Sequence, residues 1–186
     1  MPPAPHTCVT TCGQSHEAID FSFAADFPDP YANLSADARD TRAILVTDHC
    51  IIDQKTFFLC GCLEIPIIGH SEPFLWGLWA IVWEKDFDEI DDCWESPGRE
   101  KTHGPFQGRL ANSLKDYPET LNLKLKIVLG APFKPGFGLS GFTVGTRALF
   151  YIEESEHPLA QEQHGISYQL AMERASLYLH HRRMFR

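Results

Sequence analysis

The chain has 186 residues, a length that suits one domain or one domain with a small appendage. Hydrophobic residues make up 44% of it and charged residues 22%, which supplies enough apolar side chains for a core and excludes disorder of the whole chain. The 25 acidic and 16 basic residues give a formal net charge of −9. Because the chain lacks the overall basic charge typical of nucleic-acid-binding proteins, we expect no nucleic-acid partner.

The sequence predicts neither a secretory signal nor a membrane helix. Residues 1–7 contain no positively charged region followed by an apolar run, which a secretory signal needs. The apolar residues 73–83 and the uncharged residues 135–146 are both shorter than the roughly 20 residues of a membrane helix. We therefore expect a cytoplasmic protein without a membrane partner, whose six cysteines are free thiols or metal ligands.

Residues 1–20 are expected to form a small Cys/His knuckle next to the main domain. Cys8, Cys12 and His16 are three residues of the types that bind zinc, and Gly13 would let the backbone turn between them. Cys50 is the candidate for the fourth ligand of a tetrahedral zinc site. The alternative is that these cysteines are small, half-buried residues that hold no metal, and both interpretations remain open.

The chain then predicts a short helix and a group of strands. Ser35 is a suitable N-cap for a helix over residues 36–40. The turn-like residues around Gln54 predict a β-hairpin. Three runs rich in strand-forming residues surround that turn or precede it: residues 43–46, 50–52 and 56–63.

The next two segments differ in their periodicity. Residues 74–83 carry tryptophans at helical spacing, but their length and β-branched residues favour a buried strand. In residues 84–95, Phe87, Ile90 and Trp94 recur at helical spacing and acidic residues occupy the remaining positions. This second pattern predicts an acidic helix with one buried face.

The most regular pattern in the chain is the alternation over residues 121–129, which predicts a half-buried antiparallel strand. Every second residue is apolar: Leu121, Leu123, Leu125, Ile127 and Leu129. After a Gly/Pro-rich segment at residues 131–146, residues 147–152 predict another strand and Ser167 is expected to cap a closing helix. The sequence therefore predicts one α+β domain over residues 21–186, with a mainly antiparallel sheet, an acidic mid-chain helix and a C-terminal helix.

Six short segments follow one another along the chain: CGQSH at 12–16, DHCIID at 48–53, GCLEIP at 61–66, FLWGLW at 74–79, YPETL at 117–121 and HPLAQEQ at 157–163, the last followed by Gly165 and Ile166. In their order and spacing, they resemble the bacterial family called domain of unknown function 2199. This resemblance implies no reaction, ligand or catalytic residue for the chain. Compared with the family pattern, the Gly/Pro-rich segment at residues 131–146 resembles an inserted segment.

Four residues are candidates for acid/base catalysis or for metal-assisted chemistry. Asp48 and Asp53 flank an apolar strand, and His157 and Glu162 lie in a polar segment that follows another strand. A carboxylate and an imidazole can exchange protons only if the fold brings them within hydrogen-bonding distance. The alternative is that they are turn and surface residues, which is common for acids at turns.

Another set of residues predicts a ligand pocket. Trp76 and Trp79 could supply a flat apolar wall, with His157 and Gln163 as polar contacts. The alternative for the two tryptophans is ordinary core packing. Cys60 and Cys62 are expected on opposite faces of their strand, and therefore in the core rather than at a common metal.

The leading functional hypothesis is a soluble bacterial binding or accessory module of unknown function that binds a small-molecule or protein partner in an aromatic-lined pocket. The alternative is a small, metal-assisted enzyme that uses His157 or Glu162 together with Asp48 or Asp53, in a specialised biosynthetic pathway. Zinc is the only cofactor that the sequence suggests, through the knuckle described above.

Overall fold

The computed structural model describes residues 8–9, 15–16, 21–132, 147–154 and 156–179. The strands are β1 (Cys8–Val9), β2 (Ser15–His16), β3 (Ser22–Ala24), β4 (Ala43–Leu45), β5 (His49–Ile52), β6 (Thr56–Ile65), β7 (Phe74–Val82), β8 (Phe106–Leu110), β9 (Lys124–Leu129) and β10 (Ala148–Ile152). The helices are α1 (Asp29–Ala32), α2 (Ala36–Arg42), α3 (Glu84–Cys93), α4 (Arg99–Thr102), α5 (Pro158–Glu162) and α6 (Tyr168–Leu179).

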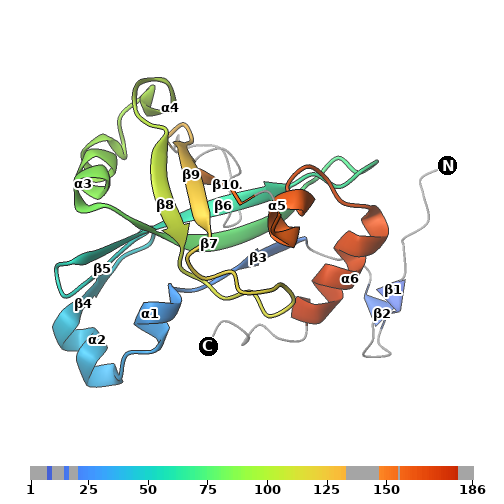
Figure 1. The fold of residues 1–186 in the computed structure, drawn as a ribbon, viewed down its shortest axis with the longest axis horizontal. Coiled ribbons are helices and arrows are strands. Elements are labelled where there is room, and N and C mark those ends of the chain that lie inside the picture. The colour runs from blue at the N-terminus through green and yellow to red at the C-terminus, as the bar shows by residue number, and fades with distance from the viewer. Residues whose placement is uncertain (1–7, 10–14, 17–20, 133–146, 155, 180–186) are drawn as a thin grey trace.

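The central sheet closes into a small barrel. Strands β6, β7, β8, β9 and β10 pair in that order, and β10 pairs back with β6 (Figure 1). At this closing pair, a Cβ on Gly61 would lie 2.5 Å from the Phe150 ring and 2.7 Å from the carbonyl oxygen of Ala148. Since any larger residue would clash there, a glycine allows the two strands to approach.

The central sheet contains parallel pairings as well as antiparallel ones. β10 pairs with β6 in parallel, and β3 pairs with β7 in parallel. The other pairings of this sheet are antiparallel, including both neighbours of β9. The fold is thus a mixed α+β structure built around a small barrel.

The side chains of β9 confirm the alternation that predicts a strand here. Leu125, Ile127 and Leu129 are buried inside the barrel, while Lys124 and Lys126 are exposed outside it. The strand is shorter than residues 121–129, because the positive φ of 66° at Asn122 places a turn before Lys124.

The predicted hairpin around Gln54 joins β5 to β6. Asp53 and Gln54 have φ angles of 55° and 53°, in the left-handed region, and the amide of Lys55 donates a hydrogen bond to the carbonyl oxygen of Ile52 across this turn. The short helix that follows Ser35 is also present as α2, and the Ser35 hydroxyl accepts a hydrogen bond from the amide of Ala38.

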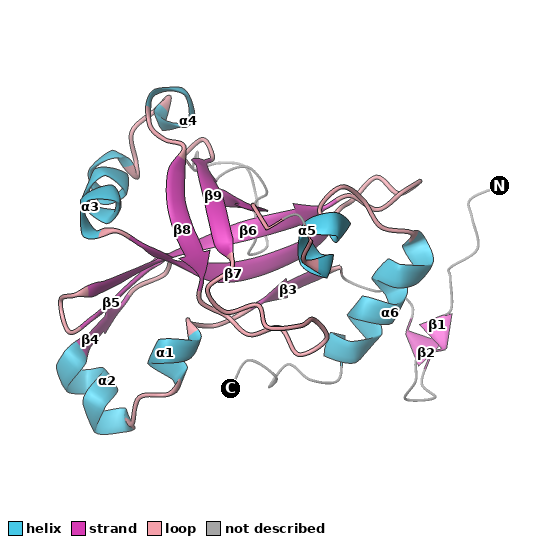
Figure 2. Ribbon diagram, viewed as in Figure 1, coloured by secondary structure: helices cyan, strands magenta, loops and turns pink. Residues whose placement is uncertain are grey.

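The two larger helices confirm the predicted acidic helix and closing helix. α3 buries Phe87, Ile90 and Cys93 and leaves its acidic residues outside. α6 begins after Ser167, whose hydroxyl accepts a hydrogen bond from the amide of Leu170. The helices lie around the barrel, with α1 to α4 toward one end of the long axis and α5 and α6 toward the other (Figures 1 and 2).

Two predicted features lie largely outside the described residues. In the N-terminal segment, β1 pairs with β2 so that Cys8 faces His16 in register, whereas Cys12 falls outside the described part of the chain. Most of the predicted insertion, residues 133–146, is likewise not described. None of the helices within the described ranges has the length and apolar character needed to cross a membrane.

A candidate binding face on the outside of the barrel

The outward side chains of β8 and β9 form a cationic surface. On β8, Gln107 and Arg109 are exposed between inward-facing residues, and on β9 the same holds for Lys124 and Lys126. This arrangement follows from the two-residue period of a strand, since the intervening residues fill the barrel interior. The apolar residues that force the cations outward include Phe106, Leu110, Leu125 and Ile127.

The strand register arranges these residues in two rows. In the first row, Ile81 of β7 lies opposite Arg109, which lies opposite Lys124. In the second row, Gln107 lies opposite Lys126, which lies opposite Tyr151 of β10. Directly paired residues on one sheet face have Cβ atoms about 5 Å apart, so neighbours within a row are close, while each row as a whole curves around the barrel.

Trp83 extends the second row at its β7 end. It follows Val82, the partner of Gly108 in the ladder, and its neighbour on the sheet is therefore Gln107. The Trp83 side chain is 74% exposed, and Tyr151 at the other end of the row is 45% exposed. We call Trp83, Gln107, Arg109, Lys124, Lys126 and Tyr151 the outer face.

A hollow of about 240 Å³ lies at the Trp83 end of this face. Its walls are mainly apolar, and it is lined by Ile81, Val82, Trp83, Gln107, Gly108, Arg109 and Lys124. The indole and two cations therefore border one cavity, an arrangement that suits a partner with an apolar group next to a negative charge.

The Trp83 side chain is largely exposed at the start of α3. It is the N-cap residue of α3, and its side chain makes no capping hydrogen bond. Ser, Thr, Asp and Asn are preferred at N-caps because their side chains accept hydrogen bonds from the first helical amides. An exposed tryptophan at such a position departs from local structural preference, and such departures are expected at functional sites.

Two of the cationic positions are fixed by neighbouring groups. Arg109 Nη1 donates a hydrogen bond to the carbonyl oxygen of Asn122 at 3.2 Å. The backbone amide of Lys124 donates to the carboxylate of Glu154 at 2.8 Å, which holds the start of β9 next to the end of β10. The outer face is thus a local cationic surface on a chain whose net charge is −9.

The residues predicted to form an aromatic pocket lie elsewhere. Trp76 and Trp79 are 0% and 1% exposed, and neither lines the hollow at Trp83. The Trp79 indole donates a hydrogen bond to the carbonyl oxygen of Ala25. Trp76 packs edge-on against Tyr178, with 4.7 Å between the ring centroids. The structure places both indoles in the core, as the core-packing alternative expects.

The predicted polar contacts of that pocket hold backbone segments together. His157 is the N-cap of α5, and its Nδ1 accepts a hydrogen bond from the amide of Leu159. Gln163 binds Ile152 through both ends of its amide: Nε2 donates to the carbonyl oxygen at 2.9 Å, and Oε1 accepts from the backbone amide at 3.0 Å. The side chain thereby pairs with the end of β10 as a neighbouring strand would.

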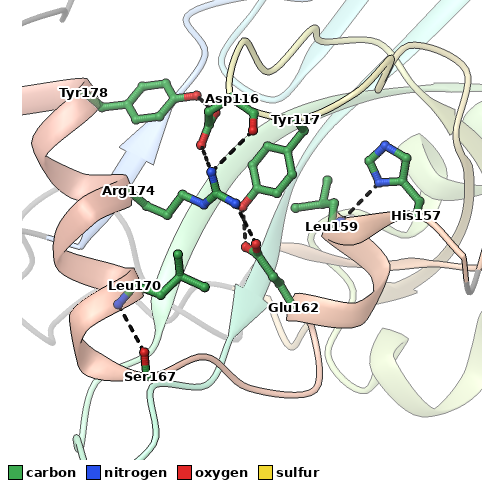
Figure 3. A network of polar contacts seen from close by, with 9 residues as sticks. All are labelled: Asp116, Tyr117, His157, Leu159, Glu162, Ser167, Leu170, Arg174 and Tyr178. Carbon is green, nitrogen blue, oxygen red and sulfur yellow. Dashed lines mark hydrogen bonds and ion pairs between the residues drawn. The ribbon is translucent and has the colours of Figure 1, made fainter.

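Glu162 belongs to a network of ion pairs that joins α5, α6 and the loop at residues 116–117 (Figure 3). Its carboxylate accepts a hydrogen bond from Tyr117 at 2.5 Å and pairs with Arg174 at 2.7 Å. Arg174 also pairs with Asp116 at 2.9 Å, and the Tyr178 hydroxyl donates to the same Asp116. Both oxygens of Glu162 are therefore engaged.

The two aspartates that flank β5 are also engaged by arginines. Asp48 lies 3.2 Å from Arg147, whereas Asp53 forms a two-oxygen pair with Arg42 at 2.6 and 2.8 Å. Hydrogen bonding to Arg42 lowers the pKa of Asp53. β5 and α5 lie at different ends of the molecule (Figure 1), so the structure does not bring the predicted catalytic residues together.

Three of the described cysteines are buried thiols near the barrel wall. Burial raises the pKa of Cys50 to about 12, of Cys60 to about 12 and of Cys62 to about 11, so all three are protonated at neutral pH. The prediction that Cys60 and Cys62 lie on opposite faces was wrong, because residues two apart on a strand share a face. Arg147 Nη1 donates to the sulfur of Cys60 at 3.2 Å.

The described residues contain no group of three or more His, Cys, Asp or Glu side chains that could share a metal ion. Cys50 packs in the core beside Phe58 and Trp79. Figure 1 shows its strand β5 at the end of the molecule opposite to β1 and β2, where Cys8 and His16 lie. Because Cys12 is not described, the zinc hypothesis for the knuckle remains a prediction.

Sequence patterns alone single out none of the residues of the outer face. One signal for it was present, since Lys124 and Lys126 alternate with the buried residues of the predicted strand. Trp83, however, ends a segment of tryptophans that are otherwise buried. Only the pairing of β8 with β9 shows that Arg109 joins the two lysines.

The comparison with known proteins identifies the family. The model of a family described as uncharacterized protein conserved in bacteria, the domain of unknown function 2199, matches residues 7–166, and the chain belongs to this family. The resemblance inferred from the six sequence segments is thereby confirmed, and it assigns no function. Neither a curated protein nor a solved structure matches the chain.

Proposed function

We propose that this member of the bacterial family is a binding module, and that its outer face holds a partner carrying a negative charge next to an apolar group. The observation that carries the proposal is the hollow at Trp83, where an exposed indole lies beside Arg109 and Lys124. An indole supplies flat apolar area, and a guanidinium and an ammonium favour carboxylates or phosphates.

An enzyme that uses the predicted catalytic residues has less support. Asp48, Asp53 and Glu162 are each paired with a different arginine. Each of these carboxylates therefore already has a cationic partner within the protein. The thiols of Cys50, Cys60 and Cys62 are protonated at neutral pH, which removes the usual form of a cysteine nucleophile.

The proposal is tested with phenylacetate, which combines an aromatic ring with a carboxylate. We expect it to bind the protein saturably, whereas phenethylamine, which carries the opposite charge on the same ring, should bind much more weakly. The variants Trp83→Ser and Lys124→Ala should weaken phenylacetate binding. Lys101→Ala removes an exposed lysine of α4 that does not line the hollow, and should leave binding unchanged.

The stability of the same variants shows whether a loss of phenylacetate binding results from unfolding. Trp83→Ser introduces a preferred N-cap, so the free energy of unfolding should stay constant or rise by about 0.5–1 kcal/mol. Urea denaturation measures this change. Retained phenylacetate binding in a folded Trp83→Ser protein, or equal binding of the amine, would show that the outer face is not the binding site.

A further inference from the structure

A β-bulge lies beside the hollow, where β8 meets the residues that precede β9. The amide of Asn122 donates a hydrogen bond to the carbonyl oxygen of Leu110 at 2.8 Å, and the amide of Leu110 donates to the carbonyl oxygen of Leu123 at 2.9 Å. Two residues on one side of the pairing therefore lie opposite one residue on the other, which defines a bulge. The next pair in the ladder is Arg109 and Lys124, the two cations that line the hollow.

The first residue of this bulge has an unusual backbone conformation. Asn122 has a φ of 66°, in the left-handed region that glycine usually occupies in bulges of this type. Asparagine is one of the few other residues that adopt this conformation at small cost. The Asn122 carbonyl oxygen accepts a hydrogen bond from Arg109 Nη1 at 3.2 Å. Because bulges next to binding sites re-aim side chains, this one is suited to orient the Arg109 guanidinium.

The remaining donors of Arg109 have no partner within the described part of the chain. Arg42, Arg147 and Arg174 each pair with a carboxylate of the protein. Arg109 is exposed, makes no ion pair with a described residue, and donates to none of them through Nε or Nη2. A guanidinium carries five donor hydrogens, so the hydrogen bond at Nη1 leaves the edge formed by Nε and Nη2 available.

The Arg42 side chain shows what this edge of a guanidinium binds. Nε and Nη2 of Arg42 donate to the two carboxylate oxygens of Asp53, at 2.8 and 2.6 Å. Such a two-oxygen contact is stronger and more directional than a single hydrogen bond, and a lysine cannot form it. Arg109 offers the same edge beside the hollow, where a carboxylate from outside the protein can occupy it.

The charged groups at the start of β9 favour a ligand with one negative charge. Glu154 accepts hydrogen bonds from the amide of Lys124 with both carboxylate oxygens, each at 2.8 Å. Arg109 and Lys124 contribute two positive charges here and Glu154 contributes one negative charge. A carboxylate balances the remaining positive charge, whereas a phosphate monoester, with a charge of about −1.5 to −2 at neutral pH, exceeds it.

We propose, building on the function proposed above, that the negative group of the ligand is a carboxylate, which Arg109 binds at both oxygens through Nε and Nη2. Lys124 adds a second positive charge, and the apolar part of the ligand lies against Trp83. Asn122 is a positioning residue, because its carbonyl oxygen holds Nη1 and leaves the other edge of the guanidinium to the ligand.

Isothermal titration calorimetry with phenylacetate tests this contact through substitutions that keep the charge. Arg109→Lys retains a cation but removes the two-oxygen contact, so binding should weaken about tenfold, as for the loss of one charge-assisted hydrogen bond. Lys124→Arg also keeps its charge and should change the affinity by less than about twofold, because Lys124 acts as a point charge. Benzylphosphonate, which carries a dianion on the same ring, should bind more weakly than phenylacetate.

A second pair of variants tests Asn122. Asn122→Gly keeps the left-handed conformation, so phenylacetate should bind within about twofold of its affinity for the original protein. Asn122→Val opposes this conformation and should weaken binding about fivefold. In NMR spectra, the signal of the Arg109 Nε proton should shift on addition of phenylacetate in the original protein and in Asn122→Gly, but not in Asn122→Val.

The outcomes separate this inference from the proposed function. Equal affinity of Arg109→Lys and the original protein for phenylacetate, with loss in Trp83→Ser, would overturn the two-oxygen contact and keep the outer face as a binding site. Tighter binding of benzylphosphonate would overturn the carboxylate. Unchanged affinity and an unchanged Arg109 shift in a folded Asn122→Val protein would overturn the role of Asn122. No binding of phenylacetate to the original protein would overturn both proposals.

Discussion

The imidazole of His49 lies between aromatic rings of α3 and the following turn. Its ring centroid is 5.1 Å from that of Phe87 and 4.9 Å from that of Trp94. Nδ1 is 3.5 Å from Asp91, and Nε2 is buried without a hydrogen-bond partner. Burial lowers the pKa of His49, and this effect outweighs the nearby carboxylates of Asp91 and Asp48, which raise it.

This lowered pKa predicts an acid-sensitive contribution to stability. In the unfolded chain, His49 takes up a proton as pH falls through about 6.5, whereas in the folded protein it does so only at lower pH. The free energy of unfolding should therefore decrease as pH falls from about 7 toward 5. Denaturation curves at a series of pH values measure this decrease.

The control for this prediction is a matched pair of variants. His49→Phe removes the titrating ring but keeps an apolar ring, so it should flatten the pH dependence between pH 7 and 5. His164→Asn removes an exposed histidine and should keep the slope of the original protein. An equal slope in His49→Phe and the original protein would contradict the assignment to His49.

At the scale of elements, the network of Figure 3 fixes α6 to the barrel. Arg174 pairs with carboxylates from two other segments, and its guanidinium lies 4.4 Å from the Tyr117 ring. Burial lowers the pKa of Arg174, but the hydrogen bond to Glu162 and the surrounding negative groups raise it overall. Burial and Glu162 also raise the pKa of the Tyr117 hydroxyl, which stays protonated as a donor.

Removing the central cation should destabilise this attachment. Arg174→Ala leaves Asp116 and Glu162, whose side chains are 11% and 12% exposed, without their counter-ion. We expect a loss of about 3 kcal/mol in the free energy of unfolding, as for other buried pairs that lose one partner. Tyr117→Phe removes one hydrogen bond and should cost about 1 kcal/mol.

Chemical denaturation of the two variants checks this order of effects. A double variant that combines Arg174→Ala with Glu162→Gln should lose less than the sum of the single losses, because the two residues interact directly. Additive losses would contradict a network in which Arg174 is the common partner.

Local patterns predict the elements of this fold well. The two-residue hydrophobic period of β9 and the 3.6-residue period of α3 depend only on residues that are close in sequence. The same is true of the turn residues in the β5–β6 hairpin. The same reasoning does not assign a role to Gln163, Glu162 or His157. Their polar side chains are equally consistent with a binding site, a helix cap, hydrogen bonds to a strand or an ion pair. Only the positions of β10 and α6 distinguish these roles.

At the scale of the whole molecule, barrel closure could not be predicted from sequence. The parallel pairing of β10 with β6 joins Ala148 to Gly61, and these residues are distant in the chain. Alternation shows which residues face inward, but it does not show which strands become neighbours. The outer face depends on that order, because it combines residues of β8, β9 and β10 with one at the end of β7.

Backbone and indole NMR of the protein with added phenylacetate tests the central claim most directly. Four indole signals are expected, one for each tryptophan of the chain. Our account predicts that the Trp83 indole shifts together with the amides of Gln107 and Arg109, while the buried indoles of Trp76 and Trp79 do not move. Shifts confined to Trp76 or Trp79, with Trp83 unchanged, would contradict it.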